Sequence, residues 1–434
     1  MTTIELYDSK PKVYRHREMY ELGEFPPLGV VPKYMKAATI RPESYGKPAD
    51  AFAIEDVPVP SMGPHQVLVL VMAAGINHNS VWASQGKPLD VIKLRQKMGQ
   101  TEDFHIGGSD ASGIVWAVGE AVRHVKPGAP VVISTAAFNP RAIDALMGGV
   151  SIYSQSSLAW GYEVNYGAFG QFTLVEEYQC FSKPENLTWE AAACYMLCAG
   201  TAYRQLMGWH PNVVTPGAPV LIWGGAGGLG SMAIQITKAF GGIPIAVVSN
   251  EERKEHCLRL GAKGVINRND FDHWGDLPVQ REHMKMKRWT DGVRAFYDEY
   301  KSQLGDSRKP KIVFEHSGAG TLPTSVFMCD TGGMVTICGA TTGYIGTLDL
   351  RYLWMRSKRL QGSHGAELKE YAAVNQLVAD GRIDPCLSYT ESFENIGAIH
   401  QMMHDNQHPP GNLAVLVNAP EKGLRSLPAD LSIY

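Results

Sequence analysis

The sequence predicts an α/β protein of two domains, in which a parallel sheet covered by helices interrupts a domain rich in β-strands. Three observations support this fold class. The chain has 434 residues, which at roughly 150 residues per domain corresponds to two or three domains. Its first part is a succession of short strand-like segments, and its middle part alternates strands with helices. Its last part is mixed, so the chain leaves one domain, builds a second and returns, with a cleft between the two.

The first part begins with a polar, irregular stretch, residues 1–34, in which Pro26, Pro27 and Pro32 exclude a regular helix. From Met35 onwards, segments rich in β-branched residues are separated by Pro and Gly turns, which predicts short strands. These segments are MKAATIRPE, FAIEDVPVP, HQVLVLVMAAGIN, GGSDASGIVWAVG, APVVIST and, after a mixed stretch, FTLVEEYQCFS.

Helical periodicity begins at TWEAAACYMLCAGTAYRQLMG, for which Thr188 is the expected N-cap. Five strands are expected next, PVLIWG, IPIAVVSN, KGVINR, KIVFEHSG and GGMVTICGA, and the helices GSMAIQITKAFG and EERKEHCLRLGA separate the first three. A long charged stretch precedes the fourth strand. This alternation is typical of βαβ units and of a parallel sheet with both faces covered. The last segments, ELKEYAAVNQLVADGRI, FENIGAIHQMMHDNQ and LAVLVN, predict two helices and a strand.

Composition excludes several classes of function. The 40 Lys and Arg against 43 Asp and Glu give a formal charge of −3, which lacks the basic excess of a nucleic-acid-binding protein. The N-terminal residues are charged throughout, without the apolar core of a signal peptide, and no apolar run approaches the roughly 18 residues of a membrane helix. We therefore expect a cytoplasmic protein with neither a nucleic-acid nor a membrane partner.

The seven cysteines show no spacing typical of a disulfide framework or of a zinc site. Cys194 and Cys198 lie four residues apart on an expected helix, and no pair of His or Cys lies nearby in the sequence to complete a metal site. Buried thiols in a reducing compartment are the simplest interpretation. We expect no bound metal.

The sharpest motif is GGAGGLG, which stands directly after an apolar strand and directly before an amphipathic helix. Its GxGxxG spacing is typical of the dinucleotide-binding turn of a Rossmann fold, where exposed N–H groups and the helix dipole bind phosphate. Gly225 would form the tight turn, Gly227 would let the backbone approach the pyrophosphate, and Gly230 would allow close helix–strand packing. Gly228 and Leu229 complete the loop. An ordinary tight strand–helix turn is the alternative.

The end of the following strand indicates which dinucleotide binds. NAD-binding domains carry Asp or Glu there to hold the ribose 2′-hydroxyl, whereas this strand ends near Ser249, with Arg253 and Lys254 close behind. A small hydroxyl and two cations suit a 2′-phosphate, so we expect NADPH rather than NADH. Glu251 and Glu252 weaken this inference, and the two cations alternatively belong to the solvated face of a helix.

Together, the β-rich first part, the glycine loop and the returning segment resemble the medium-chain dehydrogenase/reductase superfamily. The resemblance implies a GroES-like β-rich catalytic domain, residues 1–195 completed by residues 346–434. It also implies an NADP-binding Rossmann domain, a doubly wound parallel sheet, over residues 196–345. Zinc-dependent members carry a cysteine where this chain has GINHN and a lobe with four cysteines, whereas this chain has no cysteine before Cys180. It therefore resembles the zinc-free reductases.

Segments along nearly the whole chain resemble crotonyl-CoA carboxylase/reductases, in the same order. They are YELGEFPPLGVVP, GINHNSVWAS, GGSDASGIVWAVG, WGYEVNYGAFGQF, GTAYRQL, VFEHSG, RYLWMRSKRLQGSHGAE and NQHPPGNLAVLV. The resemblance implies that NADPH delivers hydride to the β-carbon of an α,β-unsaturated acyl-CoA, crotonyl-CoA or a longer enoyl-CoA. The enolate would then attack CO2 at its α-carbon and yield an alkylmalonyl-CoA.

The same resemblance places Asn79, Tyr162, Glu163 and His364 at the reaction. An Asn amide donates to an oxygen of CO2, and Glu163 and His364 would orient a bridging water toward the other oxygen. Tyr162 would exclude bulk water, whose proton would quench the enolate. Without the resemblance, the simplest interpretation of Asn79 is a turn residue, that of Glu163 a surface carboxylate and that of His364 a structural histidine.

By resemblance, Thr201 lines the nicotinamide site, and Arg351 and Tyr352 contact CoA within a run of cations at 351–359. A homodimer or homotetramer paired through sheet edges of the nucleotide domain is implied as well. The segment 134–157 departs from the family, which leaves the preferred acyl chain open. The alternative functions are a non-carboxylating NADPH-dependent enoyl-thioester or quinone-type reductase and a catalytically silent NADP(H)-binding protein.

Overall fold

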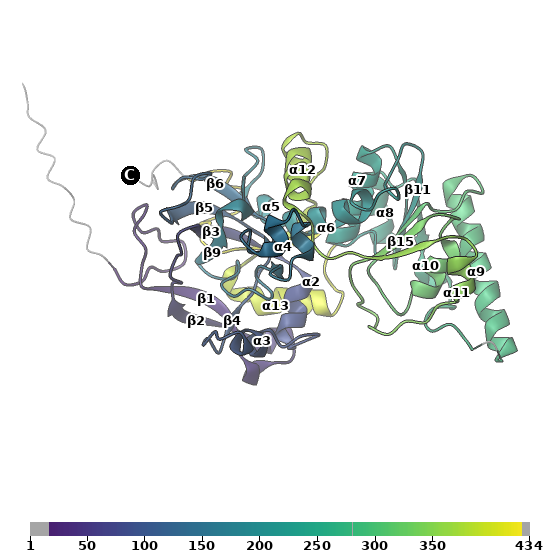
Figure 1. Cartoon of the computed structure of the whole chain (residues 1–434), viewed down its shortest axis with the longest axis horizontal. Coiled ribbons are helices and arrows are strands. Elements are labelled where there is room, and N and C mark those ends of the chain that lie inside the picture. Colours follow the sequence, from purple (N-terminus) through teal and green to yellow (C-terminus); the bar gives the residue numbers. More distant parts are fainter. Residues whose placement is uncertain (1–16, 280, 428–434) are drawn as a thin grey trace, which may run out of the picture.

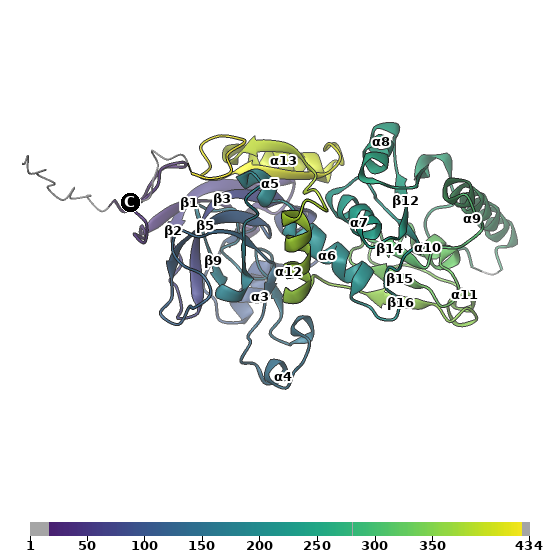
Figure 2. The same ribbon diagram turned by 90° about the horizontal axis from the view of Figure 1, so that it is seen from above.

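The computed structural model of the chain describes residues 17–279 and 281–427. It consists of two lobes side by side, a β-rich lobe and an α/β lobe, and helices α6 (Met196–Met207) and α12 (Leu368–Ala379) lie where they meet (Figures 1 and 2). No helix within the described residues is long and apolar enough to cross a membrane.

The β-rich lobe is built on a seven-stranded sheet in the order β10-β6-β5-β3-β18-β17, with β9 also paired to β3. Strand β3 is buried along almost its whole length because neighbouring elements cover both of its faces. The last strand, β18, pairs antiparallel with β3 through Leu413 and Ile76, so the end of the chain completes the lobe that its first part began. The strands are β3 (Gln66–Ile76), β5 (Ala111–Val118), β6 (Pro130–Ile133), β9 (Phe172–Glu176), β10 (Cys180–Ser182), β17 (Leu387–Ser392) and β18 (Asn412–Leu416).

Smaller elements surround this sheet. A three-stranded sheet has the order β2-β1-β4, and β7 and β8 form a two-stranded ladder beside the segment 138–157. Helix α4 stands out from the lobe in Figure 2. Their bounds are β1 (Tyr34–Ile40), β2 (Phe52–Pro58), β4 (His105–Ile106), β7 (Ala136–Ala137), β8 (Leu158–Ala159), α1 (Pro48–Ala51), α2 (His78–Ser84), α3 (Val91–Lys97), α4 (Ile143–Leu146) and α13 (Ile396–His404).

The α/β lobe is a six-stranded parallel sheet in the order β13-β12-β11-β14-β15-β16, which is the strand order of a Rossmann fold. The sheet continues beyond residue 345, the expected end of this domain, because β16 pairs with β15. Its elements are β11 (Pro219–Ile222), α7 (Gly228–Ala239), β12 (Ile243–Val248), α8 (Glu251–Leu260), β13 (Gly264–Asn267), α9 (His283–Leu304), β14 (Ile312–Glu315), α10 (Leu322–Met328), β15 (Met334–Ile337), α11 (Leu350–Trp354) and β16 (Arg359–Gly362).

One helical prediction needs correction, and the long charged stretch supplies a further helix. The helix expected over 188–208 is two helices, α5 (Trp189–Ala192) and α6, although Thr188 does cap the first by accepting from the Ala191 N–H at 3.3 Å. The chain breaks between them where it passes against β3, so closely that a side chain at Gly75 would collide with the Ala193 carbonyl. The long charged stretch contains the 22-residue α9, whose buried residues recur at helical spacing: Trp289, Val293, Phe296, Tyr300 and Leu304.

Candidate active site

A cavity of about 350 Å³ lies between the two lobes and brings together residues from four distant parts of the sequence. Asn79 comes from the start of α2, Tyr162 from the segment after β8, Thr201 from α6 and His364 from the segment after β16. Leu229 of the glycine loop lines the same cavity. Five of the residues predicted from the sequence are therefore neighbours around one space.

Asn79 and Asn77 are held by two consecutive residues of the loop before β5. The Asn79 amide donates from Nδ2 to Ser109 Oγ at 2.7 Å, and the Asn77 amide donates from Nδ2 to Asp110 Oδ2 at 3.1 Å. Asp110 also accepts the N–H of Leu197 at 2.9 Å, which ties the turn to the first residues of α6. Burial raises the pKa of Asp110 to about 7, while these donors oppose the rise.

Tyr162 and Glu163 are neighbours in the sequence but have different surroundings. The Tyr162 hydroxyl donates to the Lys87 carbonyl at 3.0 Å, and burial raises its pKa to about 12, so the phenol stays neutral. The Glu163 carboxylate accepts the N–H of Ala159 at 2.8 Å and does not line the cavity. Glu163 therefore supports the turn that carries Tyr162 rather than facing the space itself.

The remaining wall comes from α6, α12 and the segment before α12. Thr201 is half-buried, whereas His364 is exposed and lies at the mouth of the cavity. Tyr371 and Thr135, which also line it, share a hydrogen bond between their hydroxyls. Apolar side chains form much of the rest of the wall: Trp82, Pro88, Ile152, Leu158 and Leu197.

A second cavity, of about 480 Å³, runs over the carboxyl ends of β11 and β12 and past the glycine loop. Gly227, Ser249 and Arg253 line it, as predicted for a dinucleotide site. His78 and Trp82 line both this cavity and the first one, so the two spaces adjoin.

The glycines of the loop differ in what they provide. The positive φ of the turn, +56°, is at Gly224, which precedes the motif. A side chain at Gly225 would meet Ala246 Cβ at 2.7 Å, and one at Gly230 would meet the Gly225 Cα at 2.6 Å, so both allow close packing. Beside Gly227 the nearest such atom is 3.6 Å away, which leaves room for a phosphate at the N-terminus of α7. Gly228 packs against Asn412.

The second cation of the cofactor cavity is Arg268, a residue that the sequence reasoning missed. Arg253 and Arg268 both line the cavity beside Ser249, and none of the described residues that line it is Asp or Glu. The pKa of Arg253 is lowered by burial, and the charge of Arg268 adds to that shift. Lys254 does not line the cavity and pairs with Glu251 at 3.2 Å. Arg268 follows β13, so the carboxyl end of that third strand was the signal available in the sequence.

Comparison with known proteins places this site in a family. The chain matches the alcohol dehydrogenase GroES-like domain over residues 63–185 and the zinc-binding dehydrogenase family over residues 228–380. It is 46% identical to a crotonyl-CoA carboxylase/reductase of Cereibacter sphaeroides, across 98% of this chain and 96% of the relative. The chain belongs to the crotonyl-CoA carboxylase/reductase family. A crotonyl-CoA reductase of Streptomyces avermitilis is 37% identical over 87% of this chain and 84% of its own length.

Solved structures of this crotonyl-CoA carboxylase/reductase family have the same architecture. The crotonyl-CoA carboxylase/reductase AntE, in complex with NADP, is 60% identical, with a TM-score of 0.90 over 93% of this chain and 100% of that chain. The 2-octenoyl-CoA carboxylase reductase CinF, in complex with NADP and 2-octenoyl-CoA, is 35% identical, with a TM-score of 0.84 over 92% of each chain. The two-domain medium-chain dehydrogenase/reductase fold expected from the sequence is confirmed.

The residues expected to contact CoA lie elsewhere in this member of the crotonyl-CoA carboxylase/reductase family. Arg351 and Tyr352 are on α11, toward the end of the α/β lobe that is remote from the β-rich lobe (Figure 2), and line neither cavity. Arg351 pairs with Asp349 at 2.6 Å, and the Tyr352 ring packs against Phe327 with centroids 5.3 Å apart. Their role in binding CoA stays a prediction.

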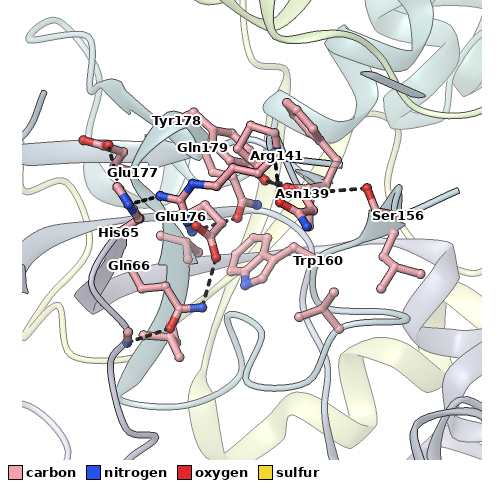
Figure 3. Close-up of a pocket in the computed structure, with 18 of the residues that line it drawn as sticks. His65, Gln66, Asn139, Arg141, Ser156, Trp160, Glu176, Glu177, Tyr178 and Gln179 are labelled. Atoms are coloured by element: carbon pink, nitrogen blue, oxygen red, sulfur yellow. Dashed lines mark hydrogen bonds and ion pairs between the residues drawn. The ribbon is translucent and has the colours of Figure 1, made fainter. Parts of the chain in front are cut away.

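A larger cavity, of about 740 Å³, lies in the β-rich lobe but contains none of the predicted site residues. Figure 3 shows its polar side chains bonded to one another: Gln66 donates to Glu176 at 3.0 Å, and Arg141 donates to His65. Trp160 and neighbouring apolar side chains line the rest. Size alone therefore does not identify the reactive site of this chain.

The family that matches residues 228–380 is described as zinc-binding. Within residues 17–279 and 281–427, no group of three or more His, Cys, Asp and Glu side chains is arranged to hold a metal ion. At the turn after β3, where zinc members would carry a cysteine by resemblance, Asn77 binds Asp110 instead.

Proposed function

We propose that this chain carries out NADPH-dependent reductive carboxylation of an α,β-unsaturated acyl-CoA. When bound, NADPH supplies a hydride to the β-carbon of the enoyl thioester. The electron pair of the double bond then resides in an enolate, whose α-carbon forms a new bond to the carbon of CO2 and yields an alkylmalonyl-CoA. The observation that carries this proposal is the single cavity that unites Asn79, Tyr162 and His364 with Thr201, at the point where it adjoins the cofactor cavity.

Three features of the cofactor cavity support NADPH as the reductant. The N-terminus of α7 and the open side of Gly227 suit a pyrophosphate. Hydrogen-bond donors suited to a 2′-phosphate come from Arg253, Arg268 and Ser249. None of the described residues that line this cavity is a carboxylate that would repel the phosphate. The NADP complexes of AntE and CinF agree with this choice.

Asn79 is the residue that we propose to bind CO2. Its Nδ2 uses one hydrogen on Ser109, which leaves the other free to donate to an oxygen of CO2. His364, exposed at the mouth, would hold a water or the second oxygen of CO2. The neutral Tyr162 ring closes the cavity against bulk water, and Glu163 fixes the turn on which Tyr162 stands.

The apolar part of the cavity wall would hold the acyl chain. Trp82, Ile152 and Leu158 offer apolar surface but no charged group, which fits a hydrocarbon tail. Both crotonyl and longer enoyl chains are candidates, because Ile152 lies within the segment 134–157, which departs from the family pattern, and Leu158 directly follows it. Relatives act on both lengths, as the names of the Cereibacter enzyme and of CinF indicate.

The experiment that tests this function measures NADPH oxidation against CO2 uptake for a panel of enoyl-CoAs from four to ten carbons, with bicarbonate and carbonic anhydrase present. We expect one CO2 consumed per NADPH. The runner-up function, a non-carboxylating enoyl-thioester or quinone-type reductase, predicts NADPH oxidation with no CO2 consumed. A protein that only binds NADP(H) predicts no turnover of any member of the panel.

A further inference from the structure

Ser109 is the hydrogen-bond partner of the Asn79 amide. Its Oγ accepts a hydrogen bond from Asn79 Nδ2 at 2.7 Å, and Ser109 is only 1% exposed. Ser109 lines the same cavity as Asn79. The other hydroxyl near this amide, Ser80 Oγ, approaches Asn79 Oδ1 only at 3.5 Å, which is too long for a strong hydrogen bond. Ser109 is thus the hydroxyl that anchors the Asn79 amide, with Nδ2 as the donor.

The orientation of this amide decides whether it attracts or repels CO2. An amide presents hydrogens on Nδ2 and lone pairs on Oδ1, and the two ends occupy nearly the same volume. With Nδ2 on Ser109, the second hydrogen of that nitrogen remains available to a CO2 oxygen. A rotated amide would place the electron-rich Oδ1 at the same point, where it would repel the oxygen of CO2.

The support beneath Ser109 is rigid. The next residue, Asp110, is fully buried and accepts from both Asn77 and the N–H of Leu197. The Asp110 carbonyl in turn accepts the N–H of Gly75 at 3.0 Å. Because Asn77, two residues before Asn79, is bonded to Asp110, the residue after Ser109, these contacts keep the hydroxyl close to the amide that it holds.

We propose that Ser109 is a positioning residue that sets the fraction of the enolate that is carboxylated rather than protonated. The enolate α-carbon forms a bond either to the carbon of CO2 or to a proton from water, and Ser109 makes or breaks no covalent bond in either step. It acts by holding Asn79 with an N–H toward CO2. The inference rests on the proposed function, because it assumes that the chain forms the enolate and that Asn79 binds CO2.

The test compares Ser109→Ala with wild type in the ratio of alkylmalonyl-CoA to saturated acyl-CoA, at fixed crotonyl-CoA, NADPH and CO2. Loss of one neutral hydrogen bond predicts a ratio lower by about five- to tenfold. The rate of NADPH oxidation should fall much less than the ratio, because hydride transfer does not involve Asn79. The apparent KM for CO2 should rise, and Ser109→Thr, which keeps the hydroxyl, should restore the ratio at least in part.

Two further variants separate positioning from a general structural role. Ser112→Ala removes another buried hydroxyl three residues along the chain, which donates to the Trp189 carbonyl at 2.6 Å and does not line the cavity. We expect Ser112→Ala to keep the wild-type product ratio. The double variant Asn79→Ala/Ser109→Ala should have the ratio of Asn79→Ala alone, because Ser109 acts only through Asn79.

Each contrary outcome has a distinct meaning. A wild-type product ratio in Ser109→Ala overturns the inference, as does an equal fall of the ratio in Ser112→Ala. An additive fall in the double variant overturns the route through Asn79. If wild type itself makes only saturated acyl-CoA, the proposed function fails rather than this inference alone.

Discussion

The rings of His78 and Trp82 meet edge to face with centroids 5.2 Å apart, at the boundary between the cofactor cavity and the catalytic cavity. Both residues are on α2, the helix that also carries Asn79. Burial lowers the pKa of His78 to about 4, so this boundary carries no charge near neutral pH. Both cavities therefore share a wall made of a neutral imidazole and an indole.

Trp82→Ala should weaken the binding of both NADPH and the enoyl-CoA, because the indole that is lost lines both cavities. We expect kcat/KM to fall by about tenfold or more for NADPH and for crotonyl-CoA, as for the loss of a large apolar contact. Steady-state kinetics with each substrate varied in turn measures this. Met284→Ala, at an 80% exposed side chain outside both cavities, is the control and should leave both values within about twofold.

Arg268→Ala should reduce the preference for NADPH over NADH. Removing one charged hydrogen bond to a 2′-phosphate predicts a fall in kcat/KM for NADPH of about 10- to 100-fold, with little change for NADH. Lys254→Ala is the control, because Lys254 pairs with Glu251 and lies outside the cavity. Equal effects of the two substitutions, or an equal loss with both cofactors, would contradict the assignment of Arg268.

Acid should destabilise the fold through buried neutral histidines. Burial lowers the pKa of His78 and of His400 to about 4, below the ordinary value of 6.5. Stability that is present above pH 6.5 is therefore lost as the pH falls toward 4, by up to about 1.4 kcal/mol per pH unit for each histidine. Asp110, with its pKa raised to about 7, acts in the opposite direction, since its contribution is lost as the pH rises through 7.

Urea denaturation at pH 7 and at about pH 5 measures this dependence. His400 stacks on Phe52 with centroids 4.6 Å apart, so His400→Phe keeps a ring in place and removes the titrating group. That variant should lose less stability between the two pH values than wild type. An identical pH dependence in the two proteins would show that His400 does not titrate as described.

Association through the nucleotide-binding sheet remains a prediction. Strand β16 is an edge of the six-stranded sheet, and exposed apolar side chains lie on and beside it: Trp354, Met355 and Leu360. We expect Trp354→Glu/Leu360→Glu to lower the mass measured by light scattering relative to wild type. Met284→Glu, at an exposed position on α9, is the control. An unchanged mass in the double variant would place the interface elsewhere.

Much of the fold could be predicted from local patterns. The strands and helices of this chain have the spacing of apolar residues that is typical of each kind of element. Gly227, Ser249 and Arg253 lie together at the second cavity because strand ends of a parallel sheet meet at one edge, and their role in binding the cofactor stays a prediction. Arg268 was missed although it obeys that rule, because only the second strand end was considered. The break between α5 and α6 could not be predicted from the sequence, because it depends on a close contact between Ala193 and Gly75, which are far apart in the sequence.

The site was harder to predict than the fold. The family resemblance predicted that Asn79, Tyr162 and His364 lie together, and all three line one cavity. It could not reveal that the Glu163 carboxylate accepts a hydrogen bond from the Ala159 N–H. Nor could any local pattern indicate that Ser109 holds Asn79, because 30 residues separate them. Contacts of this kind depend on how strands and loops cross, which periodicity does not encode.

The measurement that tests the central claim most directly is the mass of the product formed from crotonyl-CoA, NADPH and isotopically labelled bicarbonate in the presence of carbonic anhydrase. Reductive carboxylation predicts a labelled alkylmalonyl-CoA as the main product, and Asn79→Ala should shift the product toward unlabelled saturated acyl-CoA. An unlabelled saturated acyl-CoA as the sole product of the wild-type protein would contradict the account.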